Sequence, residues 1–154
     1  MQVRSDGGAD ITTRGVFFGG TYPAVQDTID YITFSTTGNA QDFGNLTDAR
    51  DNVQGSSSST RAVMGGGRDP SNTNIIDYIT IASTGDATDF GDLTAADYFY
   101  TATGNSTRAI WIGNSAIGNA MEFVTIATTG NALDWGDQNG DPNHSGGACS
   151  DSHG

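Results

Sequence analysis

The chain of 154 residues contains no lysine, one glutamate (Glu122), one cysteine (Cys149) and only three prolines. A single cysteine excludes both an internal disulfide and a cysteine-rich zinc site. The longest apolar run, residues 109–112, is far too short to cross a membrane. The N-terminal segment MQVRSDGGAD lacks the hydrophobic region of a signal peptide, so none is expected there.

Basic side chains are also scarce, because six arginines stand against 18 acids and give a net charge of -12. Such a chain would repel nucleic-acid phosphates, so no nucleic-acid partner is expected. Strong helix formers are few, whereas threonine, isoleucine, valine and aromatic residues are common between frequent glycine, asparagine and aspartate residues. This composition favours short strands joined by tight turns, and therefore an all-β fold.

The dominant feature of the sequence is an internal repeat. The segments TRGVFFGG, TRAVMGGG and TRAIWIGN place Arg14, Arg61 and Arg108 at intervals of 47 residues. Each segment is followed by IDYITFSTTGNA, IDYITIASTGDA or MEFVTIATTGNA, and then by DFG, DFG or DWG. The third copy is two residues shorter before Met121. Three such similar copies indicate a repeat architecture.

The repeats are predicted at 14–60, 61–107 and 108–152, after a leader strand in 1–13 and before residues 153–154, which return to the same phase. Each repeat predicts four short antiparallel strands, with the fourth strand of the first repeat in residues 49–59. Large apolar residues on both faces of IDYITF predict sheets that are covered on both sides. Four strands in about 47 residues match one blade of a β-propeller. The residues expected to form the repeated core are Val16, Phe18, Tyr31, Phe43, Val63, Tyr78, Phe90, Ile110, Phe123 and Trp135.

The order of these blocks resembles the kelch motif, in which a double glycine precedes a tyrosine, a turn, an aromatic residue and a loop ending in arginine. The first copy matches with Gly19-Gly20, Tyr31, Gly38-Asn39, Phe43 and Arg50. The second copy matches except that Asp97 replaces the arginine. The third copy departs further, because Gly113-Asn114 replaces the glycine pair and Phe123 replaces the tyrosine. The TIATTGNA and DFGDLT segments also resemble kelch-like repeats in virion proteins of tailed bacteriophages, and this resemblance implies a propeller in a tail or another virion component.

Three repeats are fewer than the four to eight blades that usually close a propeller ring. Two chains could close a six-bladed ring, chains could join head to tail into an open filament, or three repeats could form a partial ring alone. Neither end carries a polar capping repeat of the kind that solenoids need for solubility. A homo-oligomer or filament is therefore the favoured expectation.

Two rows of charges recur with the repeats: Arg14, Arg61 and Arg108, and Asp30, Asp77 and Glu122. The two rows could line a binding face or channel, but cross-strand ion pairing between them is the favoured interpretation. The aspartates before each aromatic (Asp42, Asp89 and Asp134) are predicted to form Asx-turns that accept nearby backbone N–H groups.

Candidate ligand-binding residues are the aromatic side chains of loops that differ between the repeats: Tyr22, Tyr98, Phe99 and Tyr100. Asp137, Asn139 and Asp141 resemble the opening of a calcium loop, but Ala148 stands where the bidentate glutamate would be, so a polar turn is expected and no metal or other cofactor. No catalytic constellation is visible, and His144, Cys149 and His153 all lie in the Gly/Ser-rich tail.

Together these observations favour a non-enzymatic structural or adhesive protein that self-associates, in a virion or outside the cell, with no nucleic-acid partner and no membrane insertion. Other virion proteins are further expected partners. Two alternatives stay open. One is a carbohydrate-binding or depolymerase-like phage tail module that acts on bacterial surface glycans, and the other is an intracellular kelch-type scaffold that binds proteins.

Overall fold

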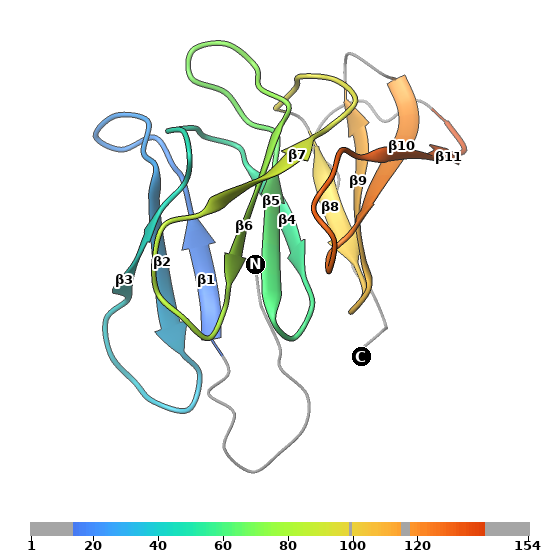
Figure 1. The fold of residues 1–154 in the computed structure, drawn as a ribbon. Helices are drawn as coiled ribbons and strands as arrows, with labels where there is room; N and C mark the ends of the chain where they lie inside the picture. Colours follow the sequence, from blue (N-terminus) through green and yellow to red (C-terminus); the bar gives the residue numbers. More distant parts are fainter. Residues whose placement is uncertain (1–13, 99, 115–117, 141–154) are drawn as a thin grey trace.

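The computed structural model describes residues 14–98, 100–114 and 118–140, and this part of the chain contains eleven strands and no helix. The strands form three antiparallel sheets (Figure 1). The first sheet contains β1 (Arg14–Phe18), β2 (Thr28–Thr33) and β3 (Gln41–Asn45). The middle sheet contains β4 (Gln54–Ser57), β5 (Arg61–Gly65), β6 (Ile75–Thr80) and β7 (Thr88–Asp92). The third sheet contains β8 (Thr101–Gly104), β9 (Arg108–Asn114), β10 (Gly118–Thr125) and β11 (Leu133–Asp137). The predicted all-β class is confirmed.

Within each sheet the strands pair in sequence order, as a meander. The fourth strand expected in residues 49–59 is present as β4, but it pairs with β5 and so opens the middle sheet instead of completing the first. Each sheet of four strands therefore begins before the arginine that marks its sequence repeat. This difference arises because periodicity fixes the length of a repeat but not the point at which hydrogen bonding divides one sheet from the next.

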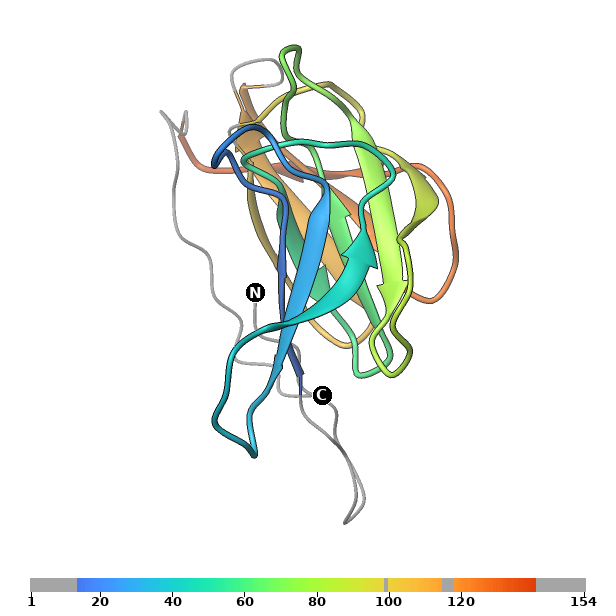
Figure 2. The same ribbon diagram turned by 90° about the vertical axis from the view of Figure 1, so that its left-hand side faces the viewer.

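The three sheets pack face to face around two apolar cores, and in Figure 2 the first sheet lies nearest the viewer with the other two behind it. Ile79 and Met64 of the middle sheet belong to the core shared with the first sheet, whereas Ile76 and Val63 belong to the core shared with the third. The middle sheet is therefore packed on both faces, as predicted from the apolar residues on both faces of the IDYIT strand. The described strands form an open stack and do not close into a ring.

A bulge recurs at the same position of every sheet. The pairing register shifts between Ile29 and Asp30, between Ile76 and Asp77, and between Met121 and Glu122. At the bulge, the backbone N–H groups of Gly91 and Gly136 donate to the carboxylates of Asp89 and Asp134 at 3.1 and 3.0 Å. The predicted Asx-turns are thus confirmed for these two aspartates.

The glycine after the bulge brings neighbouring sheets into contact. Gly91 has φ +145°, and a Cβ atom there would lie 2.6 Å from the backbone of Gly130 in the turn of the next repeat. Gly44 makes the same approach to Gly85, at 2.4 Å. At Gly136, the matching residue of the third sheet, a Cβ atom would meet nothing within 4 Å. The close approach therefore depends on a following sheet, which Gly136 does not have within the described chain.

Candidate functional site

The repeated arginines lie over aromatic rings. The guanidinium carbon of Arg14 is 4.4 Å from the ring centroid of Tyr31, and that of Arg61 is 4.6 Å from Tyr78. Tyr31 and Tyr78 in turn meet the edge-on rings of Phe43 and Phe90, each pair 5.9 Å apart. In the third sheet Arg108 lies over Phe123 and Trp135, at 5.0 and 5.1 Å, and these two rings are 5.2 Å apart. Each sheet therefore carries one arginine–aromatic cluster.

The expected ion pairing between the charge rows is wrong. In the β1–β2 pair Arg14 lies opposite Thr33, while Asp30 lies opposite Phe17. The same register holds in the middle and third sheets, so the arginine and the acid of one repeat sit at different ends of the hairpin. Asp77 and Glu122 instead face the preceding sheet, and Arg14 and Arg61 reach toward the following one.

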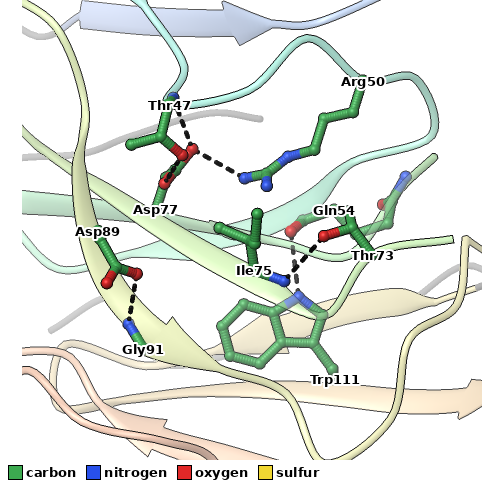
Figure 3. A network of polar contacts seen from close by, with 9 residues as sticks. All are labelled: Thr47, Arg50, Gln54, Thr73, Ile75, Asp77, Asp89, Gly91 and Trp111. Atoms are coloured by element: carbon green, nitrogen blue, oxygen red, sulfur yellow. Dashed lines mark hydrogen bonds and ion pairs between the residues drawn. The ribbon is translucent and has the colours of Figure 1, made fainter. Parts of the chain in front are cut away.

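The acids of the second and third repeats are buried at the junctions between sheets. Asp77 accepts hydrogen bonds from the backbone N–H of Thr47 at 3.1 Å and from its hydroxyl at 2.6 Å. It also forms a buried ion pair with Arg50, at 2.8 Å (Figure 3). Glu122 accepts the backbone N–H of Thr94 at 2.6 Å at the second junction. Both acids thus bind the chain segment that follows the outermost strand of the preceding sheet.

Arg50 is a buried cation whose ionisation is perturbed by its surroundings. Burial lowers the pKa of its guanidinium, and the nearby carboxylates of Asp77 and Asp48 oppose that effect. Its Nε and Nη1 atoms, like Oε1 of Glu122, are buried without a hydrogen-bond partner. In the sequence, Arg50 was identified only as the arginine of the kelch-like motif. No local pattern indicated that it pairs with Asp77, 27 residues away.

Two further contacts connect the middle and third sheets. The indole N–H of Trp111 donates to the backbone carbonyl of Gln54 at 3.0 Å (Figure 3), so the first strand of the middle sheet is joined to β9. Arg61 Nη1 donates to the carbonyl oxygens of Ile126 and Ala127, at 3.3 and 3.0 Å. The corresponding contact of Arg14 Nη1 is to Ile81, at 2.7 Å, between the first and middle sheets.

The aromatic residues proposed as a ligand site do not form one exposed cluster. Tyr22 is 90 % exposed. Tyr100, expected to be exposed, is buried in the core between the middle and third sheets, where its hydroxyl donates to the carbonyl of Ala95. Tyr98 is half-buried beneath the guanidinium of Arg68. Phe99 lies outside the described residues.

The calcium candidate is only partly within the described chain, because Asp141 lies outside it. Asp137 ends β11, and Asn139 lies in a turn in which Gly140 N–H donates to Gln138. Among residues 14–98, 100–114 and 118–140, no three histidine, cysteine, aspartate or glutamate side chains come together as a metal site.

In the same part of the chain no helix is long and apolar enough to cross a membrane.

An open hollow of about 490 Å³ lies between β1 and the first strands of the other two sheets. It is lined by Phe17, Phe18, Gly19, Val53, Gln54, Gly55 and Ala102. None of these lining residues carries a charged side chain.

The most distinctive surfaces are the two outer faces of the stack. Phe17 and Phe34 are 50 % and 47 % exposed on the first sheet, whereas Met64 and Ile81, at the same repeat positions of the middle sheet, are buried against the first. On the third sheet Trp135 is 43 % exposed, whereas Phe43 and Phe90 at its repeat position are buried.

The predicted core is therefore buried only where a sheet has a neighbour. Val16, Val63, Phe43 and Phe90 are buried, and Phe18, Tyr31 and Tyr78 pack against the cores partly buried. Ile110 and Phe123 are half-buried and Trp135 is exposed, which corrects the expectation of a buried third-repeat core. The physical reason is that no described strand covers that face of the third sheet.

No protein-family model matches the chain, and a search of the curated proteins finds no match either.

Proposed function

We propose that this chain is a non-enzymatic structural protein that self-associates through its two outer sheets. The observation that carries the proposal is that both ends of the stack expose large apolar side chains at repeat positions that are buried between sheets. Exposed apolar side chains that gather on one face of a protein are typical of interaction sites. Repeat proteins that remain monomeric cover such ends with polar capping repeats.

We further propose that the sheets are blades of a kelch-like β-propeller. Four-stranded meanders in sequence order, packed face to face with the first strands β4 and β8 in contact, are typical of propeller blades. The three sheets described are fewer than the four to eight blades that usually close a ring, so a propeller of this kind would use the association with further sheets that we propose.

The setting that fits this proposal is a virion tail or fibre, or another extracellular assembly. It rests on the resemblance of the repeats to kelch-like phage proteins. The composition supports it, because a chain with no lysine and six arginines offers few sites to trypsin-like proteases. The buried acids support a structural role, since Asp77 and Glu122 bind the neighbouring repeat and do not face a cleft.

Light scattering and mass photometry of the purified chain test the proposal. Dimers or longer assemblies of the 15.9 kDa chain are expected at micromolar concentration. A folded monomer that persists over the whole accessible concentration range would contradict it.

A glycan array tests the carbohydrate-binding alternative, for which the exposed ring of Tyr22 is the available feature. Saturable binding that is lost in Tyr22→Ala would favour that alternative, whereas the structural proposal expects no such binding.

A further inference from the structure

The two outer faces of the stack carry the repeat positions that form the two sides of the internal junctions between sheets. The first sheet exposes Phe17 and Phe34, whose counterparts in the middle and third sheets pack on a preceding sheet. The third sheet exposes Trp135, whose counterparts in the other two sheets pack on a following sheet. The first sheet therefore exposes the face that elsewhere packs on a preceding sheet, and the third sheet exposes the face that elsewhere packs on a following sheet.

The arginine contacts show which atoms meet in this interface. Arg14 donates to the carbonyl of Ile81, and Arg61 donates to that of Ile126. Both acceptors hold the repeat position that Phe34 holds in the first repeat. Arg108 is exposed, and within the described chain its guanidinium has no hydrogen-bond acceptor. The carbonyl of Phe34 holds the repeat position of these two acceptors, and no arginine of the described chain donates to it.

Backbone hydrogen bonds repeat in the same way. At the first junction, the N–H groups of Gly85 and Ala87 donate to the carbonyls of Phe43 and Asn45, each at 2.7 Å. At the second junction, Gly130 and Ala132 donate to Phe90 and Asp92, each at 2.8 Å. A turn of one repeat thus seats on the outermost strand of the preceding sheet.

In the first repeat, the turn at residues 38–40 matches the turns at Gly85 and Gly130, and it is exposed. In the third sheet, β11 matches the strands on which those turns lie. The N–H groups of Gly38 and Ala40 donate no hydrogen bond in the described part of the chain. The carbonyls that match Phe90 and Asp92 belong to Trp135 and Asp137, on the edge strand of the third sheet. The open approach at Gly136 leaves room for the backbone of such a turn.

A side-chain cap completes the pattern. The backbone N–H of Asn45 donates to the carboxylate of Asp86 at 3.0 Å, and that of Asp92 donates to the side-chain oxygen of Asn131 at 3.1 Å. The corresponding third pair is the N–H of Asp137 with the side chain of Asn39.

From these contacts we propose that the third sheet of one copy docks on the first sheet of a second copy, head to tail, in the register of the internal junctions. Arg108 of one copy donates to the Phe34 carbonyl of the next, and the Gly38–Ala40 turn of that copy seats on β11. This inference rests on the proposed self-association and adds its partner, polarity and register. The interface is heterologous, since two different surfaces meet.

Cross-linking of two single-cysteine variants tests the register. Asn39→Cys and Asp137→Cys are each made in a Cys149→Ser background, mixed, and oxidised with copper phenanthroline. We expect a disulfide-linked dimer on a non-reducing gel from the mixture and from neither variant alone. The matched control is the double variant Asp92→Cys/Asn131→Cys, whose cysteines occupy the same contact inside one chain and should link without a change in mass.

The outcomes separate this inference from the proposed function. If the mixture self-associates but forms no 39–137 link while the control links, the head-to-tail register is wrong and self-association stands. A 39–39 or 137–137 dimer from one variant alone would replace it with a symmetric interface. Folded monomers in every sample by light scattering before oxidation would contradict both proposals.

Arg108→Ala provides a second test that does not depend on cross-linking. Loss of a charged hydrogen bond should raise the dissociation constant of self-association about tenfold, measured by sedimentation velocity. Circular dichroism melting checks that the variant remains folded, as expected because Arg108 is exposed and its guanidinium lies over two rings of its own sheet. An unchanged dissociation constant would remove Arg108 from the interface.

Discussion

At the residue scale, the two junctions between sheets use different side chains at matching positions. Asp77 is bound by Arg50 and twice by Thr47, whereas Glu122 accepts the backbone N–H of Thr94 at 2.6 Å, and its Oε1 has no hydrogen-bond partner within the described chain. Removing one member of a buried pair leaves an uncompensated charge, which is costly in a low-dielectric interior. The stability of the first junction should therefore depend strongly on Asp77.

Asp77→Ala should lower the free energy of unfolding by roughly 3–5 kcal/mol, because it strands the buried Arg50 guanidinium and two Thr47 donors. Arg50→Met should cost less, since Asp77 keeps both contacts to Thr47. Urea denaturation of the two variants and of the double variant Arg50→Met/Asp77→Leu measures the difference. A loss below about 1 kcal/mol for Asp77→Ala would show that the pair is unimportant for stability.

At the scale of single elements, the recurrent unit is a strand with a bulge whose glycine accepts the turn of the next repeat. Gly91 combines a positive φ with a close backbone neighbour, whereas Gly136 has a positive φ of +128° and no neighbour. The two positions therefore separate the cost of backbone strain from the cost of a steric clash between sheets.

Gly91→Ala should destabilise the monomer by about 1–3 kcal/mol more than Gly136→Ala, because only the first places a methyl group against another backbone. Thermal or urea unfolding at low protein concentration, where the chain is monomeric, measures this. Equal losses for the two variants would mean that φ alone accounts for both glycines.

The elements themselves were largely predictable from the sequence, and their surroundings were not. Alternation and turn residues predicted the strands around Tyr31, Tyr78 and Phe123, and the Asx-turns at Asp89 and Asp134 followed from local chemistry. The exposure of Trp135 could not be predicted, since its sequence context matches that of Phe43 and Phe90. The burial of such a side chain depends on whether another sheet packs on its own sheet. The local sequence of a repeat is the same whether that repeat lies at the end of the stack or in its interior.

The burial of Tyr100 was missed for a related reason. Its loop differs between repeats, and this variation favoured a role in ligand binding. The chain there leads directly into β8 and brings the ring of Tyr100 against Gly66, where an added Cβ atom would lie 2.7 Å from the ring. Only the tertiary path of the connection decides whether such a ring faces solvent.

At the scale of the whole molecule, a net charge of -12 acts against the association of copies. Repulsion between like-charged copies is screened by salt, while burial of Phe17, Phe34 and Trp135 is not weakened by it. Apolar contacts and short hydrogen bonds, and not long-range attraction, should therefore hold copies together.

Raising the salt concentration from about 20 mM to about 300 mM should increase the assembled fraction, because the Debye length falls from well above 10 Å to below it. Sedimentation velocity at constant protein concentration measures the change. Trp135→Asp is the control, and it should remain monomeric at both salt concentrations. Dissociation of the unmodified chain by salt would instead indicate that ion pairs dominate the interface.

The buried Arg50–Asp77 pair has a consequence for how the chain folds. Neighbouring repeats with similar sequences are prone to misassembly and domain swapping, because each sheet presents nearly the same face to every other. Asp97 stands where the second repeat would have its own Arg50. A wrong neighbour at the first junction would therefore leave the carboxylate of Asp77 buried without its cation. One guanidinium thus distinguishes the native order of the sheets from its swapped alternatives, much as a single polar residue fixes the register of a coiled coil.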